Sequence, residues 1–132
     1  MTSLSVLYVD DDADIRTIVS LALSLDPTIT LRVATSGAEA LDVVAAGFVP
    51  DVAVLDVMMP GMDGLTLLDR LHALPVAAKV PVIFMTAQAR QADIAAYQAR
   101  GAIGVIVKPF DPIRLAACVR EMLLKNRSVP SA

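Results

Sequence analysis

The chain has 132 residues, 56% of them hydrophobic but few of them aromatic, and a formal net charge of −3. This length allows one compact domain and excludes a second domain of ordinary size. Scattered lysine and arginine residues argue against direct binding of nucleic acid. Because the sequence has neither an apolar run near the ~20 residues that cross a bilayer nor the basic start of a secretory signal, we expect a cytoplasmic protein that does not bind membranes.

Five short hydrophobic segments alternate with longer segments of helical periodicity, a pattern typical of repeated β-α units around a parallel sheet. The expected strands cover residues 5–9, 30–34, 52–55, 82–85 and 103–107. The expected helices cover residues 13–25, 38–46, 65–73, 91–100 and 113–125. We therefore predict one α/β domain over residues 1–125, followed at residues 126–132 by a tail or the start of a linker.

Some helix starts have recognisable capping residues. Asp12 is expected to cap the first helix, and Ser36 with Glu39 three residues later fits a capping box for the second. Asp111 followed by Pro112 fits an N-cap with proline at the first position of the last helix.

Four of the five strands run into a specific polar residue at their carboxyl end. These residues are Asp10 and Asp11 after the first strand, Asp56 after the third, Thr86 after the fourth and Lys108 after the fifth. Because ligands of open parallel sheets bind outside the carboxyl ends of the strands, we expect these side chains to share one cleft.

Three carboxylates in one cleft need a cation. Each pair at 4 Å repels by roughly 4 kcal/mol at an effective dielectric constant of about 20. Mg2+ fits because it binds a few carboxylate oxygens and keeps several waters. Lys108 supplies a second positive charge, which suits an oxygen of a phosphoryl group.

Each of these residues also has a structural interpretation. Thr86 alone fits a helix cap, and Lys108 alone fits a surface lysine. Asp56 is different because it ends a very hydrophobic strand and is followed by Val57-Met58-Met59, which is not a polar helix start. Pro60-Gly61 and Asp63-Gly64 fit tight turns that need no catalytic role.

Four segments, in this order, resemble the receiver domain of two-component response regulators. They are Val9-Asp10-Asp11-Asp12, Leu55 to Gly64, Thr86-Ala87 and Lys108-Pro109-Phe110, within a resemblance that runs from Val6 to about Leu124. The resemblance implies a flavodoxin-like (βα)5 fold, a doubly wound five-stranded parallel sheet in the order 2-1-3-4-5 that is known for the receiver CheY.

The resemblance also implies a reaction and its residues. A sensor histidine kinase or histidine phosphotransfer protein would donate a phosphoryl group to the carboxylate of Asp56, in a reaction catalysed by the receiver itself and not by a turnover enzyme. The implied metal ligands for Mg2+ are Asp10, Asp11, Asp56 and the backbone carbonyl of Met58, and the implied phosphoryl contacts are Thr86, the amide of Ala87 and Lys108.

The resemblance places the phosphodonor against the first helix and the loop after the fifth strand. The implied contact residues are Ile15, Ile18, Pro109 and Phe110, with a core position as the alternative for Ile18. Phosphorylation would then reorganise a face built from the fourth helix, fifth strand and fifth helix, to which an unknown downstream protein binds.

Many receivers have an aromatic residue three positions before the lysine, whereas this chain has Val105. The fifth strand also lacks an acidic residue common in DNA-binding dimers, which favours a relay or partner-binding role.

Three alternatives have distinguishing features. A haloacid-dehalogenase-like phosphatase also uses an aspartyl phosphate, but it normally has a second aspartate where this chain has Met58. An interaction module that works without phosphorylation would lack an acid, the threonine or the lysine. A flavodoxin-like FMN binder would have a phosphate-binding loop after the first strand, which this sequence does not contain.

Overall fold

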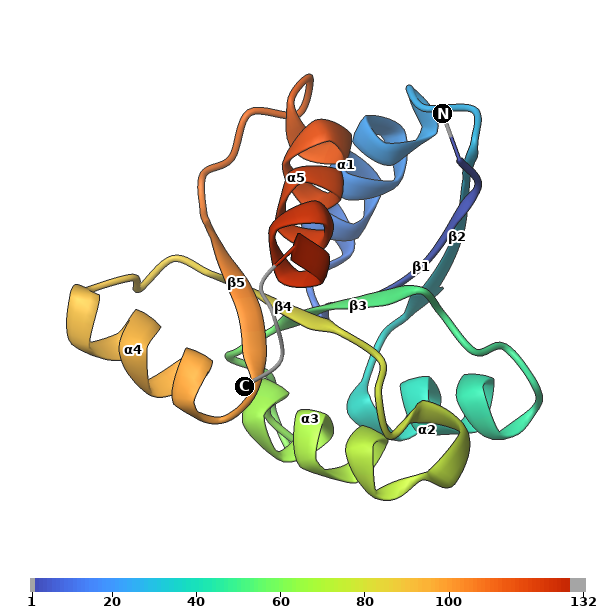
Figure 1. Ribbon diagram of the computed structural model, residues 1–132, viewed down its shortest axis with the longest axis vertical. Helices are drawn as coiled ribbons and strands as arrows, with labels where there is room; N and C mark the ends of the chain where they lie inside the picture. The colour runs from blue at the N-terminus through green and yellow to red at the C-terminus, as the bar shows by residue number, and fades with distance from the viewer. Residues whose placement is uncertain (1, 129–132) are drawn as a thin grey trace.

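The computed structural model describes residues 2–128 of the chain as five strands and five α-helices in alternation. In chain order the elements are β1 (Leu4–Val9), α1 (Ala13–Ser24), β2 (Ile29–Ala34), α2 (Gly37–Ala45), β3 (Val52–Asp56), α3 (Gly64–Ala73), the 3-10 turn η1 (Pro75–Ala77), β4 (Val82–Thr86), α4 (Gln91–Ala99), β5 (Ala102–Val107) and α5 (Leu115–Ser128). The strands form one parallel sheet in the order β2-β1-β3-β4-β5, which confirms the predicted fold (Figure 1).

The sheet has a hydrophobic core on each face. One core packs Leu55 and Phe84 against α2 and α3, and the other packs Val54 and Met85 against α1 and α5. Adjacent strand residues point to opposite faces, so β3 and β4 contribute to both cores, and all five residues of each are buried. Helices on both faces therefore explain why these strands are hydrophobic throughout and do not alternate with polar residues.

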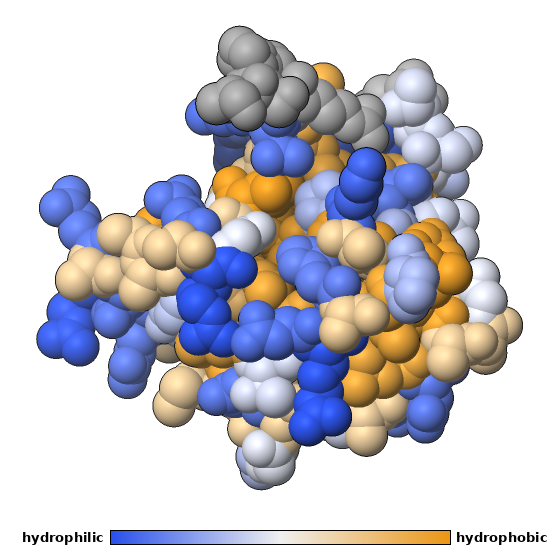
Figure 2. Space-filling model, turned by 60° about the horizontal axis from the view of Figure 1, so that its bottom comes forward, coloured by the Kyte–Doolittle hydropathy of each residue, from blue (hydrophilic) through white to orange (hydrophobic). Residues whose placement is uncertain are grey.

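Helix α4 is the least embedded helix of the described chain, because none of its nine residues is buried. Tyr97 attaches it to the sheet through an edge-on contact with Phe84, with ring centroids 5.4 Å apart. In Figure 2 the segment projecting on the left, where Figure 1 places α4, is coloured mainly blue or pale. Little apolar packing therefore holds this helix in place.

The predicted caps of the first two helices are present. The carboxylate of Asp12 accepts hydrogen bonds from the N–H groups of Asp14 and Ile15, at 2.9 and 3.2 Å. The hydroxyl of Ser36 accepts from the N–H of Glu39 at 3.1 Å, which is half of the predicted capping box. The other half is missing because the Glu39 carboxylate accepts from the hydroxyl of the neighbouring Thr35 instead.

Two local predictions are wrong. Asp63 and Gly64 are not a separate turn, because the Asp63 carboxylate accepts from the N–H of Thr66 at 2.8 Å and caps α3. The Asp111 carboxylate accepts from the N–H of Ile113 at 3.0 Å, as a cap does, but what it caps is a tighter turn, closed by the N–H of Arg114 and the carbonyl of Asp111, and not α5 itself. The regular helix starts at Leu115, two residues later than predicted.

At its other end α5 continues to Ser128, three residues beyond the predicted end at 125. Residues 129–132 of the predicted tail lie outside the described residues. Among the described helices, none combines the length and the hydrophobicity required to span a bilayer.

Candidate functional site

The carboxyl ends of β1 and β3 bring three acidic side chains together, as predicted. Asp10, Asp11 and Asp56 each offer one carboxylate oxygen, and these three atoms lie within 4.8 Å of one another. Asp10 is fully buried and Asp56 is 5% exposed, whereas Asp11 is exposed. This arrangement of hard oxygen donors, open to solvent on one side, suits a small divalent cation.

Lys108 reaches this acidic group from the end of β5. Its ammonium nitrogen lies 3.3 Å from Oδ2 of Asp10 and 3.5 Å from Oδ1 of Asp56. The backbone N–H of Lys108 donates to the carbonyl of Thr86 at 2.8 Å, which fixes the end of β5 beside the end of β4. The Lys108–Pro109 peptide bond is cis. One ammonium group thus faces two nearly buried carboxylates at once.

Asp10 has further hydrogen-bond partners that the sequence interpretation missed. The hydroxyl of Tyr8, which is fully buried, donates to Oδ2 of Asp10 at 2.5 Å. The N–H of Asp12 donates to the other oxygen at 3.0 Å, and the Arg16 guanidinium donates to the Asp10 carbonyl at 2.9 Å. The sequence spacing could have predicted the contact between Tyr8 and Asp10. Tyr8 lies two residues before Asp10, and side chains two residues apart on an extended chain point to the same side.

The surroundings of Asp56 and Tyr8 disfavour the ionised forms of both side chains. Burial, and then the neighbouring charge of Asp10, raise the pKa of Asp56 to about 6, although Lys108 and the N–H of Met58 act in the opposite direction. Burial and the hydrogen bond to Asp10 raise the pKa of Tyr8 far above its ordinary value, so its hydroxyl stays a donor. A bound cation would favour ionised Asp56.

A hollow of about 280 Å³ opens over these groups. It is lined by Asp11, Asp12, Asp56, Met58, Thr86, Ala87, Gln88 and Lys108. The side chain of Thr86 is buried, and its oxygen accepts a hydrogen bond from the N–H of Gln88 at 3.1 Å. The structure therefore brings the predicted metal and phosphoryl residues to one hollow, except that Asp10 is fully buried and is not among the lining residues.

Gly64 is a second feature that the sequence interpretation missed. A Cβ atom at this position would lie 2.4 Å from the carbonyl oxygen of Asp56 and 2.9 Å from the Cα of Val57. The N–H of Gly64 donates to the carbonyl of Val57 at 3.0 Å. The start of α3 therefore contacts the backbone of the candidate nucleophile at a distance that only glycine permits.

The four predicted docking residues differ in exposure. Ile15 and Phe110 are half-buried and pack against the core beneath α1 and α5. Ile18 is 41% exposed and Pro109 is exposed. The alternative that placed Ile18 in the core is thus wrong, and Ile15 is the isoleucine that packs inward.

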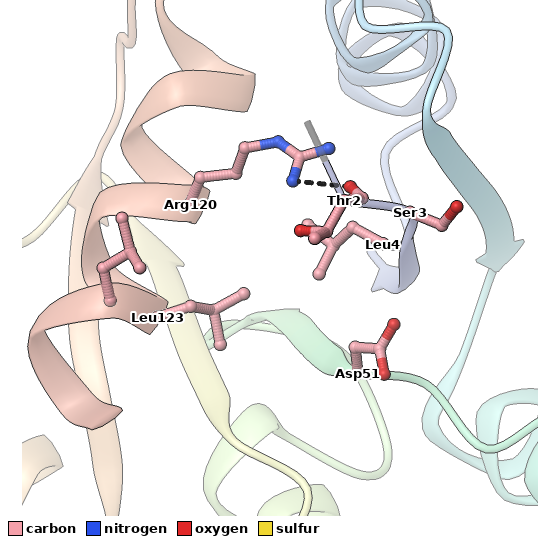
Figure 3. Close-up of a pocket in the computed structure, with 7 residues that line it drawn as sticks. Thr2, Ser3, Leu4, Asp51, Arg120 and Leu123 are labelled. Carbon is pink, nitrogen blue, oxygen red and sulfur yellow. Dashed lines mark hydrogen bonds between the residues drawn. The ribbon is translucent and has the colours of Figure 1, made fainter. Parts of the chain in front are cut away.

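A second hollow, of about 440 Å³, lies at the opposite end of the sheet beside the start of β1 (Figure 3). Its charged residues are engaged in structural contacts. The carboxylate of Asp51 accepts from the N–H of Ser5 at 2.8 Å, and Arg120 donates to the carbonyl of Thr2 at 3.0 Å and to Asp26 at 2.9 Å. The hollow that contains Asp56 is therefore the better candidate for a reactive site.

Comparison with known proteins agrees with this geometry. Residues 6–120 match the family described as the response regulator receiver domain. The chain is 37% identical over 118 residues to the transcriptional regulatory protein CseB of Streptomyces avermitilis, covering 89% of this chain and 48% of CseB. It is 34% identical over 126 residues to the DNA-binding response regulator MtrA of Mycolicibacterium paratuberculosis, covering 96% of this chain and 54% of MtrA. The chain thus spans about half the length of these two regulators.

A solved structure extends the similarity to the whole fold. The chemotaxis response regulator CheY4 of Vibrio cholerae matches with a TM-score of 0.81 and 31% sequence identity. The match covers 92% of this chain and 99% of the CheY4 chain.

Proposed function

The chain belongs to the response regulator receiver domain family, a family of phosphoacceptors in two-component signalling, and we propose that Asp56 is the residue that accepts the phosphoryl group. The observation that carries this proposal is the position of its carboxylate. Asp56 lines the open hollow at the carboxyl end of β3, with Oδ1 3.5 Å from the ammonium group of Lys108. A nucleophile and a cation for the phosphoryl oxygens thus stand side by side.

Receiver domains bind Mg2+ at a cluster of aspartates, and Asp10, Asp11 and Asp56 form such a cluster here. We assign Asp11 and Asp56 as direct ligands, with the Met58 carbonyl as a third. Both oxygens of Asp10 already accept hydrogen bonds, from Tyr8 and Asp12, which favours contact with the ion through water. When bound, the ion supplies positive charge that offsets the carboxylates and the phosphoryl oxygens.

The transfer itself then needs little more than positioning. A carboxylate oxygen of Asp56 attacks phosphorus in line, and the bond from phosphorus to the leaving group breaks. That bond is P–N for a phosphohistidine, whose imidazole leaves, and P–O for acetyl phosphate, whose acetate leaves. Lys108, the Thr86 hydroxyl and the Ala87 amide hold the phosphoryl oxygens. The product is an aspartyl phosphate on the receiver, so the reaction is a single covalent modification and not turnover of a substrate.

The family implies a histidine kinase or phosphotransfer protein as the donor. We propose that the donor contacts Ile18 and Pro109, the exposed pair, with Ile15 and Phe110 supporting them from below. For the output we propose a protein that binds the face formed by α4, β5 and α5. The weak anchoring of α4 supports this proposal, because an element with few buried contacts reorganises at low cost.

Intact-mass analysis after incubation with acetyl phosphate and Mg2+ tests the assignment. The wild-type chain should gain one phosphoryl group, and the gain should disappear with EDTA or with Asp56→Asn. Equal labelling of wild type and Asp56→Asn would refute Asp56 as the nucleophile. Absence of sustained p-nitrophenyl phosphate hydrolysis in the same preparation would separate a receiver from a phosphatase of the haloacid-dehalogenase type, which the comparisons do not favour.

A further inference from the structure

The hydroxyl of Tyr8 and the ammonium group of Lys108 share one carboxylate oxygen of Asp10. This oxygen, Oδ2, accepts from the hydroxyl at 2.5 Å and lies 3.3 Å from the Lys108 nitrogen. The other oxygen, Oδ1, accepts from the N–H of Asp12 at 3.0 Å. Three donors therefore hold a carboxylate that is itself fully buried, and both of its oxygens are engaged.

The position of Tyr8 is set by the core of the protein. Its ring is fully buried among the residues that pack the sheet against α1 and α5, and its hydroxyl also contacts the sulfur of Met85 at 3.8 Å. A close-packed core leaves such a ring little freedom to move, and a buried hydroxyl keeps its acceptor because losing it is costly. Tyr8 thus holds the Asp10 carboxylate from the side of the core.

The shared oxygen makes Tyr8 a competitor of Lys108 for Asp10. The hydroxyl is a neutral donor, so it engages Oδ2 without cancelling the negative charge of the carboxylate. Without the hydroxyl, Lys108 would be the remaining side-chain donor to Oδ2, and the attraction between opposite charges in a poorly solvated place would draw the two groups together. A closer pair with Lys108 would neutralise Asp10 and leave less negative charge for a divalent cation.

We propose that Tyr8 is a positioning residue for Mg2+ binding, which acts by holding the Asp10 carboxylate in place beside Asp11 and Asp56. The role rests on the Mg2+ site proposed above for these three aspartates. Groups that orient the carboxylates of a metal site typically change metal affinity by about 10–100-fold when they are removed. Because Asp10 is assigned a contact through water, we expect an effect of about tenfold, at the lower end of this range.

Titration calorimetry with Mg2+, in the absence of any phosphodonor, tests this role. Tyr8→Phe removes only the hydroxyl and should weaken Mg2+ binding by about tenfold. Val6→Ala is the matched control, because it removes buried atoms from β1 in the same core but leaves the partners of Asp10 intact, so it should lower stability without weakening Mg2+ binding. Asp10→Ala should itself weaken binding, and adding Tyr8→Phe to it should change the affinity by less than about twofold.

A second measurement does not depend on the stability of Tyr8→Phe. The chain has two tyrosines and no tryptophan, so Tyr97→Phe leaves Tyr8 as its only phenol. Mg2+ should shift the near-ultraviolet absorption of this phenol to shorter wavelength, because a carboxylate that shares its charge with the ion is a weaker acceptor. The shift should be half complete at the Mg2+ concentration that half-saturates the calorimetric titration.

Several results would overturn the positioning role. They are a Tyr8→Phe variant that binds Mg2+ like the wild type, an equal loss of affinity in Val6→Ala, an undiminished effect of Tyr8→Phe in the Asp10→Ala background, and a Tyr8 absorption that saturating Mg2+ does not shift. A wild-type protein that binds no Mg2+ would overturn both this role and the Mg2+ site. A wild type that binds Mg2+ but is not labelled by acetyl phosphate would count against the role of Asp56 alone.

Discussion

The hydroxyl of Tyr8 donates a 2.5 Å hydrogen bond to Oδ2 of Asp10, and both side chains are fully buried. A hydrogen bond to a charged acceptor contributes about 1.5–3 kcal/mol, and its removal leaves a buried carboxylate short of a donor. Tyr8→Phe is therefore expected to lower the free energy of unfolding of the metal-free protein by roughly that amount. Urea denaturation in EDTA measures the change.

Tyr97→Phe is the matched control for this prediction. It removes the same hydroxyl from a ring that is only partly buried on α4, and it should change stability by less than about 0.5 kcal/mol. Equal effects of the two substitutions would mean that the contact between Tyr8 and Asp10 contributes nothing specific.

The sequence predicts the sheet and the cleft better than it predicts the contacts inside them. All five strand ends agree with the predictions to within one residue, because continuous hydrophobic runs between helical segments have few other interpretations. Parallel topology then brings Asp10, Asp56 and Lys108 together without further information. The tight turn before α5 was not predictable, because Asp111 followed by Pro112 suits either a turn or a helix start.

Gly64 and Tyr8 show a different limit. The approach of Gly64 to the carbonyl of Asp56 depends on how closely α3 packs against the end of β3, and neither spacing nor composition contains that distance. The alternation of side chains along the strand places Tyr8 and Asp10 on the same side. The hydrogen bond between them also depends on the buried position of Asp10, which the sequence does not show. Contacts between residues therefore have to be seen in the structure, whereas the polar residues at the strand ends can be identified from the sequence.

Substitution of Gly64 should disturb the site through the backbone. In Gly64→Ala the new methyl group meets backbone atoms of Asp56 and Val57 that cannot rotate away, so we expect a loss of about 1–3 kcal/mol in stability and slower labelling by acetyl phosphate. Gly37→Ala is the control, since the three atoms nearest to its new methyl group all belong to the Met62 side chain and none to the backbone. Thermal unfolding and labelling rates measure both effects. A tolerated Gly64→Ala with normal labelling would contradict the close approach.

The raised pKa of Asp56 predicts how the stability of the metal-free protein depends on pH. The pKa is about 6 in the folded chain and about 3.9 for an unfolded aspartate, so between these values the folded state holds a proton that the unfolded state releases. Stability should therefore fall as pH rises from about 4 to about 6, and it should stay lower above that range.

Asp56→Asn removes this titration. In EDTA at pH 7.5 the variant should be more stable than wild type by roughly 1–3 kcal/mol, and the advantage should shrink toward pH 4. Mg2+ should reduce the advantage at pH 7.5, because the ion stabilises the carboxylate of the wild type. A stability difference between the variant and wild type that stays constant between pH 4 and pH 8 would argue against a raised pKa at Asp56.

The exposure of Ile18 makes it the better probe of donor docking. Ile15→Asp would place a carboxylate against the core beneath α1 and α5, where lost stability would obscure lost binding. Ile18→Asp changes a side chain that is 41% exposed, so folding should survive. With a phosphotransfer protein that labels the wild type, we expect transfer to slow by about tenfold, while labelling by acetyl phosphate stays unchanged. Val49→Asp, at a 45% exposed position outside the proposed docking surface, should affect neither reaction. Parallel loss of both reactions in Ile18→Asp would mean that the residue supports the Asp56 site and not the docking of the donor.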